Sequence, residues 1–400
     1  AIDAGGEGAT GAGEGGSILL NQPIVLDNGT GSIKAGFAGG SKPKVVVGTK
    51  VGRTKHMRIM PGGALEQDQE FSGPSSVFVG RKLDEYRGAF LLEYPMDKGH
   101  VVSGGWDAME RVWEHVYSKN NLNARMEDHP ALFTEAVQNP QSNRDKTAEI
   151  FFETFRTPAL FFAPPPVLSL YSSGRTTGVV LDVGEGVTQC VPVYEGYALA
   201  HSVMRNDVAG RDVSRHMQLL LRRSGLNFTT TAEADFVKSM KEEACYVTPT
   251  PSVDSTMEKQ SRTQYQLPDG QAVTLSSERY QAPEILFNPS LVGSEEPGAA
   301  DLLVNSILKS DLDLRSTLFS HIVLAGGSTL TPGFGDRMLY EVRTKSPSHT
   351  RIRISAPPER IHSTYVGGSI LASLATFKSM WVTKAEYEEH GNRVLHRGSL

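Results

Sequence analysis

The chain has 400 residues, of which 39% are hydrophobic, and it carries 40 Lys and Arg against 45 Asp and Glu. A chain of this length exceeds the usual limit of a single core, so we expect at least two lobes, and a net charge of −5 excludes a global basic footprint for nucleic acid. Two cysteines, Cys190 and Cys245, cannot form a disulfide framework, and no apolar run reaches the roughly 18 residues of a membrane span, so we expect a soluble intracellular protein.

The first residues of the chain, 1–16, are rich in glycine and alanine. Such a stretch buries no apolar surface, so we predict a disordered tail over residues 1–20. The N-terminus also lacks the basic-then-apolar pattern of a signal peptide.

A first strand is predicted at Ile24–Leu26, followed by Asp27 and the pair Asn28-Gly29. An Asn-Gly pair favours a two-residue hairpin turn, because both residues tolerate positive φ. Gly31 keeps side-chain bulk away from the backbone N–H groups, and Lys34 returns on the second strand. This hairpin suits a polyphosphate with its Mg²⁺, although Asx-Gly turns are also common in plain surface hairpins.

A basic segment follows within residues 42–71, where Lys and Arg alternate with Met57, Ile59 and Met60. It is either a solvated loop with an edge strand or a loop whose apolar tip docks on a neighbouring molecule. Helical spacing of apolar residues then predicts core helices over residues 105–119 and 146–155.

A second hairpin repeats the pattern of the first. Residues 159–170 predict a strand, a rigid connection at prolines 164–166 and a helix start. Residues 179–187 then give an apolar strand, Asp182, Gly184 and Gly186. Two such copies predict two similar half-domains, each offering a phosphate-binding turn to one cleft.

The remaining elements are predicted as follows. One helix follows Arg211, and another, over residues 237–247, is rich in Lys and Glu and by itself typical of a solvated face. A hairpin is expected at residues 268–270, and a loop with the apolar tip Leu291-Val292 at residues 287–299. A buried strand at residues 321–327 ends in Gly-Gly and offers backbone donors to the same cleft. A predicted apolar helix starts at Gly367 and Gly368 and extends to residue 374, and we interpret these glycines as sites of close helix packing. Residues 384–400 are charged, and we expect them to be mostly exposed.

Several catalytic and binding motifs are absent from the sequence. There is no GxxxxGK(S/T) loop, and the one GxGxxG string, at residues 11–16, has no strand before it, so a P-loop or Rossmann site is not expected. No HExxH or CxxC pair supports a dedicated metal site, and no GxSxG pattern indicates a hydrolase triad.

In several long stretches, from Gln22 to the C-terminus, the chain resembles the actin family in the order and spacing of its motifs. The stretches that carry the resemblance are DNGTGSIKAGFAG (27–39), NPQSNRDK (139–146), VLSLYSSGRTTGVVLDVGEGVT (167–188), VAGRDV (208–213), KEEACYV (241–247), LAGGSTLTPGFGDRM (324–338) and APPERIHSTYVGGSILASL (356–374). Further stretches are similar to actin-related proteins of the centractin type, the filament-forming subunit of dynactin, namely NQP (21–23), EIFFETF (149–155), PALFF (158–162) and WVTKAEYEEHG (381–391).

The resemblance implies an α/β fold of two lobes, built from duplicated ribonuclease-H-like domains around a nucleotide cleft. It places the large subdomain of the first lobe at residues 21–50, 95–172 and 363–400, and its small subdomain, with the filament-contact loop, at 51–94. The second lobe would have a large subdomain at 173–208 and 295–362 and a small one at 209–294. The basic loop at 51–70 matches the family's filament-contact loop, and the loop at 287–299 matches its inter-strand plug.

The resemblance also implies ATP or ADP with Mg²⁺ as the cofactor. Asp27 and Asp182 would hold Mg²⁺ through waters, and Asp182 is the one catalytic candidate. The phosphates would contact Gly29, Thr30, Gly31, Ser32, Lys34, Gly184, Glu185, Gly186 and Val187. The adenosine would contact Gly210, Lys238, Lys241, Glu242, Gly326, Gly327, Ser328, Leu330 and Thr331.

Four positions depart from the family pattern. Pro165 stands where the family has its water-positioning glutamine, and Gln189 stands where it has a histidine. Glu185 replaces a shorter aspartate, and Ile361 replaces a lysine near the adenine. Because phosphoryl transfer needs a positioned water as well as charge neutralisation, we expect tight nucleotide binding with slow or absent hydrolysis.

The sequence leaves three functions open. The first is a head-to-tail subunit of a short filament, in a dynactin-like complex that supports microtubule-motor transport, with actin and dynactin-like subunits as partners. The second is a kinase or chaperone ATPase on the same duplicated fold, against which VGGSILASL and the loop at 287–299 argue. The third is a divergent actin-like protein in vesicle or membrane-associated trafficking without dynactin. We expect a cytoplasmic, cytoskeletal protein with no nucleic-acid partner and no direct membrane insertion.

Overall fold

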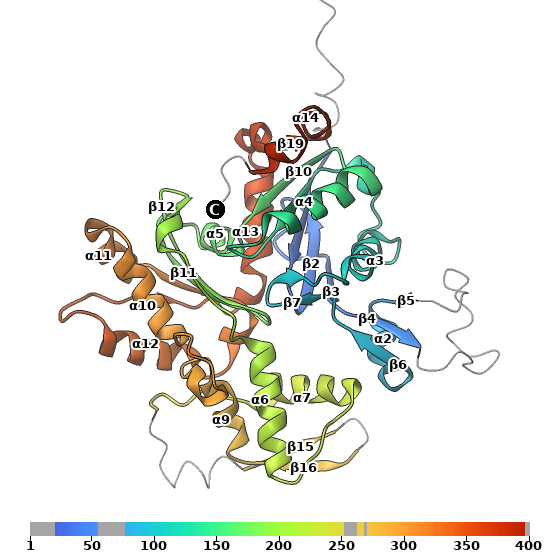
Figure 1. Ribbon diagram of the computed structural model, residues 1–400. Coiled ribbons are helices and arrows are strands. Elements are labelled where there is room, and N and C mark those ends of the chain that lie inside the picture. Colours follow the sequence, from blue (N-terminus) through green and yellow to red (C-terminus); the bar gives the residue numbers. More distant parts are fainter. Residues whose placement is uncertain (1–20, 55–76, 252–261, 268–269, 397–400) are drawn as a thin grey trace, which may run out of the picture.

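A computed structural model describes residues 21–54, 77–251, 262–267 and 270–396 (Figure 1). Four predictions therefore lie wholly or partly outside the described residues. They concern the tail at 1–20, the basic loop from residue 55 onward, the turn at 268–270 and the C-terminal residues 397–400.

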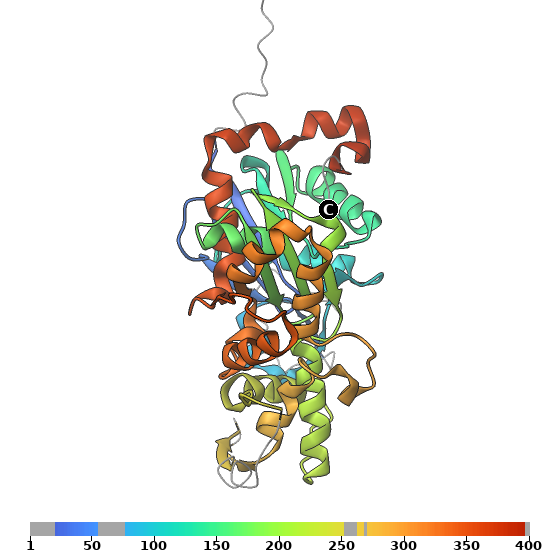
Figure 2. The same ribbon diagram turned by 90° about the vertical axis from the view of Figure 1, so that its left-hand side faces the viewer.

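Two mixed β-sheets form the centre of the molecule, which is broad in one view and thin in the other (Figures 1 and 2). In the first sheet the strand order is β19-β10-β9-β1-β2-β3, and β1 pairs antiparallel with β2 and parallel with β9. Strand β9 is buried on both faces, as is usual for parallel strands covered by helices. The strands are β1 (Ile24–Asn28), β2 (Ser32–Phe37), β3 (Val45–Gly48), β9 (Ala131–Thr134), β10 (Ala159–Ala163) and β19 (Val382–Thr383).

The second sheet repeats the plan of the first. Its order is β13-β12-β11-β17-β18, and β11 pairs antiparallel with β12 and parallel with β17, as β1 does with β2 and β9. The strands are β11 (Gly178–Val183), β12 (Thr188–Tyr194), β13 (Tyr197–Ala198), β14 (Met204–Asn206, paired with β12), β17 (Ile322–Ala325) and β18 (Ile354–Ser355). This repeat confirms the predicted two-lobed α/β architecture with two similar halves.

Short elements extend each lobe. Strand β4 pairs with both β5 and β6 beside the first sheet, and β15 pairs with β16 in the second lobe. These elements are β4 (Val51–Thr54), β5 (Val77–Phe78), α2 (Arg81–Glu85), η2 (Arg87–Ala89), β6 (Phe90–Glu93), β7 (Met96–Asp97), β8 (His100–Val101), β15 (Thr263–Gln266) and β16 (Ala272–Leu275).

The helices on the first sheet match the predicted ones in place, but not always in length. Helix α3 (Trp106–Tyr117) buries Met109, Val112 and Trp113 as predicted. Helix α4 (Gln141–Glu149) starts before the predicted residue 146. The prediction missed its first turns because they are polar and show no apolar periodicity. The helix continues as a π-helical turn, η4 (Ile150–Thr154). The other helices are η3 (Met126–Asp128), η9 (Ala375–Met380), α14 (Lys384–His390) and η10 (Gly391–His396), the last of which buries Val394 and Leu395.

The helices of the second lobe include two whose residues line the cavity described below, α6 (Gly210–Arg223) and α7 (Thr231–Ala244). Helix α7 starts earlier than the predicted residue 237, because Thr230 and Glu233 form a reciprocal cap: Thr230 Oγ1 accepts from the Glu233 N–H at 3.2 Å, and Glu233 Oε2 accepts from the Thr230 N–H at 2.8 Å. The others are η5 (Ala200–Ser202), α9 (Glu278–Glu284), η6 (Pro289–Val292), α10 (Ala299–Lys309), α11 (Leu312–Ser320), η7 (Gly327–Leu330), α12 (Phe334–Lys345) and η8 (Arg360–His362).

Two helices, α5 (Pro165–Ser172) and α13 (Ser363–Ser373), pack against each other and join the lobes. Leu168 of α5 belongs to the apolar cluster of the first sheet, whereas Leu170 belongs to that of the second. A Cβ on Gly367 would lie 1.7 Å from the Leu168 carbonyl oxygen, so this glycine is required by the close approach of the helices. The predicted close packing is confirmed, although α13 begins before Gly367.

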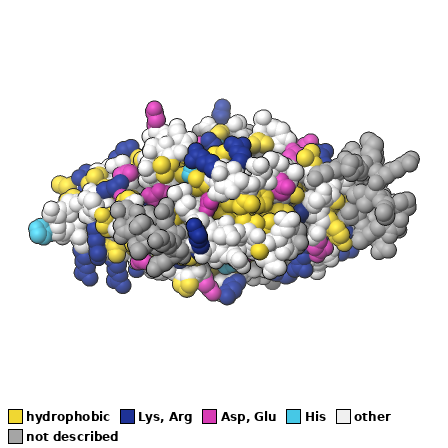
Figure 3. All heavy atoms as spheres, turned by 90° about the horizontal axis from the view of Figure 1, so that it is seen from below, with side chains coloured by type: hydrophobic (Ala, Val, Ile, Leu, Met, Phe, Trp, Pro, Cys, Tyr) yellow, Lys and Arg dark blue, Asp and Glu magenta, His cyan; other side chains and the backbone are white. Residues whose placement is uncertain are grey.

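Charges of both signs share the face seen from below in Figure 3, where Lys and Arg occur in separate groups with Asp, Glu and apolar side chains among them. This mixture reflects the nearly balanced charge counts of the sequence. Within the described part of the chain, no helix is both long and apolar enough to cross a membrane.

Replacing Gly367 by alanine should destabilise the fold. The new methyl group has no room beside the Leu168 carbonyl, so we expect the free energy of unfolding to fall by about 2 kcal/mol or more in denaturant titrations. Gly335→Ala is the matched control: Gly335 lies in α12 with open space around its Cβ position, so alanine should be neutral or stabilise by about 0.5–1 kcal/mol. Equal losses in the two variants would contradict the packing argument.

Candidate functional site

The first loop, residues 29–31, joins β1 to β2. The register pairs Asn28 with Ile33 and Asp27 with Lys34, so the loop and Ser32, the first residue of β2, lie between the last paired residues. Neither Asn28 nor Gly29 has positive φ, and the predicted two-residue Asn-Gly turn is therefore wrong. Asn28 remains in the strand because its N–H donates to Thr134 Oγ1 at 2.8 Å and its Oδ1 accepts from Trp113 Nε1 at 3.1 Å.

The second loop, residues 184–187, joins β11 to β12 in the same way. Val183 pairs with Thr188 and Asp182 pairs with Gln189, so again four residues connect the strands and an aspartate stands at the base. The Gly184 N–H donates to the Val187 carbonyl at 3.0 Å. The repeated sequence pattern thus corresponds to a repeated structure.

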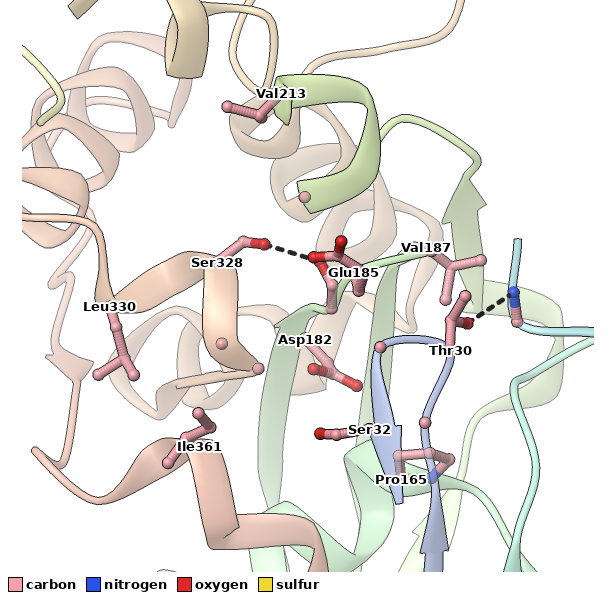
Figure 4. A pocket seen from close by; sticks show the side chains of 18 of the residues that line it. Thr30, Ser32, Pro165, Asp182, Glu185, Val187, Val213, Ser328, Leu330 and Ile361 are labelled. Carbon is pink, nitrogen blue, oxygen red and sulfur yellow. Dashed lines mark hydrogen bonds between the residues drawn. The ribbon is translucent and has the colours of Figure 1, made fainter. Parts of the chain in front are cut away.

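The two loops pack directly against each other. A Cβ on Gly31 would lie 2.9 Å from Glu185 Cβ, and a Cβ on Gly186 would lie 2.5 Å from Thr30 Oγ1. Both positions therefore need glycine because the opposite loop is so close. Figure 4 shows Thr30 of the first loop and Glu185 of the second at the edge of one space, into which Ser32 and Asp182 also point.

Residues of both loops line this space. Among the described residues, no acceptor is found for the N–H groups of Thr30, Gly31, Glu185 and Gly186. Successive unpaired N–H groups in a bend attract anionic oxygens. Two such bends in contact therefore form a site for an anion that spans both lobes.

Two buried carboxylates stand at the bases of the loops. Lys34 Nζ lies 3.0 Å from Asp27 Oδ2, whereas Asp182 Oδ2 accepts a hydrogen bond of 2.9 Å from the uncharged amide of Gln189. Burial raises the pKa of Asp182 to about 6; the hydrogen bond from Gln189 opposes this shift and the charge of Asp27 adds to it. A cation between the carboxylates would therefore be bound favourably.

Gln189 occupies in the second hairpin the position that Lys34 occupies in the first. It is buried, and its Oε1 accepts from the Val137 N–H at 3.1 Å while its Nε2 donates to Asp182. Val137 follows β9 of the first sheet, so this side chain connects the lobes. Both ends of its amide are engaged by the protein.

The second lobe supplies a charged wall through α7. Lys241 Nζ lies 3.3 Å from Glu185 Oε2 and donates to the Gly210 carbonyl at 2.9 Å. Burial alone would raise the pKa of Glu185, but Lys241, Lys238 and Arg211 together lower it below its ordinary value. Glu185 is therefore held as a carboxylate, and its side chain ties the second loop to α7.

The turn after β17 completes this wall. Gly326 has φ of 86°, and a Cβ there would lie 2.4 Å from Asp182 Oδ1, so glycine is required on both counts. Ser328 Oγ in η7 donates to the Gly184 carbonyl at 2.7 Å. In Figure 4, Ser328 and Leu330 lie on one side of the cavity and Ile361 lies near them.

These elements enclose a cavity of about 360 Å³, within the size range of small-molecule sites. Every residue that the sequence predicts to contact nucleotide or Mg²⁺ lines it, and so do the divergent residues Pro165, Gln189 and Ile361. The predicted contacts brought together here are Asp27, Gly29, Thr30, Gly31, Ser32, Lys34, Asp182, Gly184, Glu185, Gly186, Val187, Gly210, Lys238, Lys241, Glu242, Gly326, Gly327, Ser328, Leu330 and Thr331.

The sequence does not predict the other lining residues. They are Asn28, Gly99, Ala136, Val213, Cys245, Pro283, Leu286 and Thr364. Val213 lies on the predicted apolar face of a helix, which indicates core and not ligand contact. Gly99 lies at the tip of the β7–β8 hairpin, and only the structure brings its N–H to Thr30 Oγ1, at 3.1 Å.

The donor set fits a polyphosphate with a divalent cation. Among the described residues, no three His, Cys, Asp or Glu side chains gather closely enough to hold a metal by themselves. Mg²⁺ is commonly held by one or two carboxylates together with phosphate oxygens and waters. Asp27 and Asp182 can supply that share, and the unpaired N–H groups and Lys34 can hold the phosphates.

Comparison with known proteins places the chain in one family. A family model described as Actin matches residues 19–399. An "Actin-like protein" from Neurospora crassa is 48% identical over 385 residues, which cover 94% of this chain and 98% of that protein. The matched region includes both loops and every wall of the cavity.

Asp182→Asn should stabilise the nucleotide-free protein at neutral pH. Folding raises the pKa of the Asp182 carboxyl from 3.8 to about 6, so the folded state favours the protonated form. The stability that protonation contributes is fully present below pH 3.8 and is lost as the pH rises through about 6. At about pH 7.5 the amide should raise the free energy of unfolding by on the order of 2–3 kcal/mol, and the gain should disappear toward pH 4.

Denaturant titrations of nucleotide-free protein across this pH range provide the measurement. Asp311→Asn, which makes the same chemical change at an exposed helix N-cap, should show no such pH-dependent gain. A variant that is no more stable than wild type at about pH 7.5 would contradict burial as the cause of the raised pKa.

Proposed function

The chain belongs to the actin family, and on that premise we propose that its cavity binds ATP or ADP with Mg²⁺. The observation that carries the proposal is the contact between the two loops, which brings unpaired N–H groups from both lobes to one cavity. The phosphates would lie on both loops and on Lys34, and Asp27 and Asp182 would hold Mg²⁺ through waters. The adenosine would lie between α7 and η7.

Nucleotide bound in this way acts as a bridge between the lobes. Each loop contributes donors to the same phosphates, so the ligand binds the closed form of the cleft better than an open form. Binding therefore stabilises the closed, folded protein by mass action. The Mg²⁺ adds to this effect by neutralising the carboxylate pair.

We propose further that hydrolysis is slow or absent. Pro165, at the start of α5, lines the cavity but has no amide to orient a water. Gln189 has an amide, but its Nε2 is bonded to Asp182 and its Oε1 to the Val137 N–H. Charge neutralisation without a positioned water favours binding over phosphoryl transfer to water.

Restoring the family residues should restore turnover. In the double variant Pro165→Gln, Gln189→His, we expect phosphate release to rise about 10-fold or more over wild type, since a positioned general base or water-orienting group is typically worth 10²–10⁴-fold. The control is Pro164→Gln, which removes the neighbouring proline of the same connection but does not face the cavity. Actin-like turnover in the wild-type protein after assembly would refute the proposal.

We also propose that the protein is a cytoskeletal, filament-forming subunit of the centractin type, acting in a dynactin-like complex in the cytoplasm. A head-to-tail, non-closing contact between identical subunits gives a helical filament. The apolar tip Leu291-Val292 in η6 supports this proposal, because these two adjacent residues are 52% and 39% exposed and are available for a contact between subunits. The subdomain boundaries given above are part of the same proposal.

Removing this apolar tip should impair assembly and leave the monomer intact. We expect Leu291→Ser, Val292→Ser to raise the critical concentration for filament formation about 10-fold or more in sedimentation and electron microscopy, because burying the exposed half of these two residues contributes about 1.5–3 kcal/mol in total. Thermal unfolding and nucleotide content should not change. Leu312→Ser, at a residue 75% exposed at the start of α11, is the control. Normal filaments from the double variant would count against the tip as a contact.

The second candidate is a divergent actin-like protein in vesicle or membrane-associated trafficking without dynactin. The name of the Neurospora relative, an actin-like protein, fits either role. Purification of the tagged protein from its own cells distinguishes them. Recovery of dynactin subunits in stoichiometric amounts supports the first role, and filaments that lack these subunits support the second.

A further inference from the structure

One part of the cavity is lined by apolar side chains of the second lobe. They come from different elements and are Val213 of α6, Pro283 of α9, Leu286, Leu330 of η7 and Ile361 of η8. We call these residues the apolar wall. In Figure 4, Leu330 and Ile361 lie across the space from Thr30 of the first loop. A ligand whose phosphates lie on the loops therefore has room for its base beside Leu330 and Ile361.

Ile361 is the exposed member of the apolar wall. It is 38% exposed, whereas Leu286 is 3% exposed. A Cβ on Gly327 would lie 3.8 Å from Ile361 Cδ1, so the isoleucine side chain lies over this glycine. Arg360, the preceding residue, holds η8 against η7, because its Nε donates to Thr329 Oγ1 at 2.8 Å and its Nη2 to the Thr329 carbonyl at 2.7 Å. Ile361 thus offers a ligand an apolar surface and no hydrogen bond.

Three polar side chains of the same lobe that line the cavity are already engaged by the protein. Ser328 Oγ donates to the Gly184 carbonyl at 2.7 Å, and Thr331 Oγ1 donates to the Ser328 carbonyl at 3.0 Å. Lys241 Nζ donates to the Gly210 carbonyl at 2.9 Å. The two hydroxyls still offer acceptor lone pairs. Adenine and guanine both carry N–H groups that can donate to a lone pair, so these hydroxyls do not distinguish the two purines.

Helix α7 supplies two further charged side chains, Lys238 and Glu242. Glu242 is exposed, so water competes for its hydrogen bonds. A lysine ammonium is a flexible point charge, and the phosphates that a nucleotide brings are stronger acceptors than a base edge. Within the described part of the chain, therefore, no side chain that lines the cavity is held ready to read the edge of a base.

We propose that the site holds the base by apolar contact, with Ile361 as its cover, and that it binds guanine nucleotides about as tightly as adenine nucleotides. The ligand class is then purine nucleotides in general. This inference deepens the proposed function and rests on it, because it takes the phosphates to lie on the two loops.

The physical basis is that apolar contact depends on area and not on edge groups. Adenine and guanine share the same two-ring frame, so they cover the same area of the apolar wall. A base edge that keeps its water makes the same hydrogen bonds before and after binding, so exchanging its polar groups changes the affinity little. A site built to hydrogen-bond one base would instead reject the other by about 10⁴-fold or more.

The test is competition against a fluorescent ATP analogue, 1,N6-etheno-ATP, bound to the full-length protein with Mg²⁺. Unlabelled ATP, GTP and CTP displace the analogue, and the loss of fluorescence gives each dissociation constant. We expect the constants of ATP and GTP to agree within about 10-fold. CTP should bind more weakly than both, because a single ring buries less apolar surface. A preference between the purines above about 10-fold would overturn the inference, and so would CTP that binds as tightly as they do.

Ile361→Ala tests the apolar contact itself. The shorter side chain buries less surface against either purine, so we expect the dissociation constants of ATP and GTP to rise by the same factor, about 5-fold. Ile370→Ala is the matched control, because Ile370 is a 45% exposed isoleucine on α13 that does not line the cavity. It should change neither constant, and thermal unfolding of the nucleotide-free variants checks that both are folded. An unchanged affinity in Ile361→Ala, or a rise for one nucleotide alone, would contradict apolar contact.

The outcomes separate this inference from the proposed function. Tight binding of ATP with rejection of GTP overturns the inference and leaves the proposed function standing. Binding of neither nucleotide in the presence of Mg²⁺ overturns both. Tight binding of both purines, weakened equally in Ile361→Ala, supports both.

Discussion

Thr30 and Glu185 lie against glycines of the opposite loop, and neither Gly31 nor Gly186 could carry a side chain unless the other loop moved. This contact is the constraint on which the rest of the site depends. It brings two sets of unpaired N–H groups together, and it also brings Asp27 and Asp182 near each other in a buried space. Like charges in such a space repel, so the same geometry that attracts a polyphosphate also favours a cation.

The duplicated hairpins are alike in backbone and unlike in charge. At matching positions the first carries Lys34 and the second carries Gln189. The lysine neutralises the charge of Asp27. The uncharged amide of Gln189 cannot neutralise Asp182 in the same way, so burial disfavours the charged form of Asp182 and raises its pKa. Gln189 also joins the lobes, because its Oε1 accepts a hydrogen bond from the Val137 N–H.

Much of this site could be predicted from the sequence, because its loops and carboxylates repeat within the chain and resemble a known family. Local turn geometry could not: Asn28-Gly29 has the signal of a two-residue turn, but pairing with Thr134 and Trp113 holds Asn28 in the strand. Gly99 carries no local signal at all, since its place at the site comes from a contact with Thr30, far away in the chain. Helix α7 began earlier than its apolar period because a cap at Thr230, readable in the sequence, extends it.

The central claim is that one nucleotide bridges the two loops. Its most direct measurement is the adenine nucleotide released when the purified protein is denatured, quantified against protein together with its Mg²⁺. The account predicts nucleotide in a near-equimolar amount, and its loss on treatment with a chelator, because the buried carboxylates need the cation. A folded protein that carries no nucleotide and takes up none from Mg²⁺ and ATP would contradict the account.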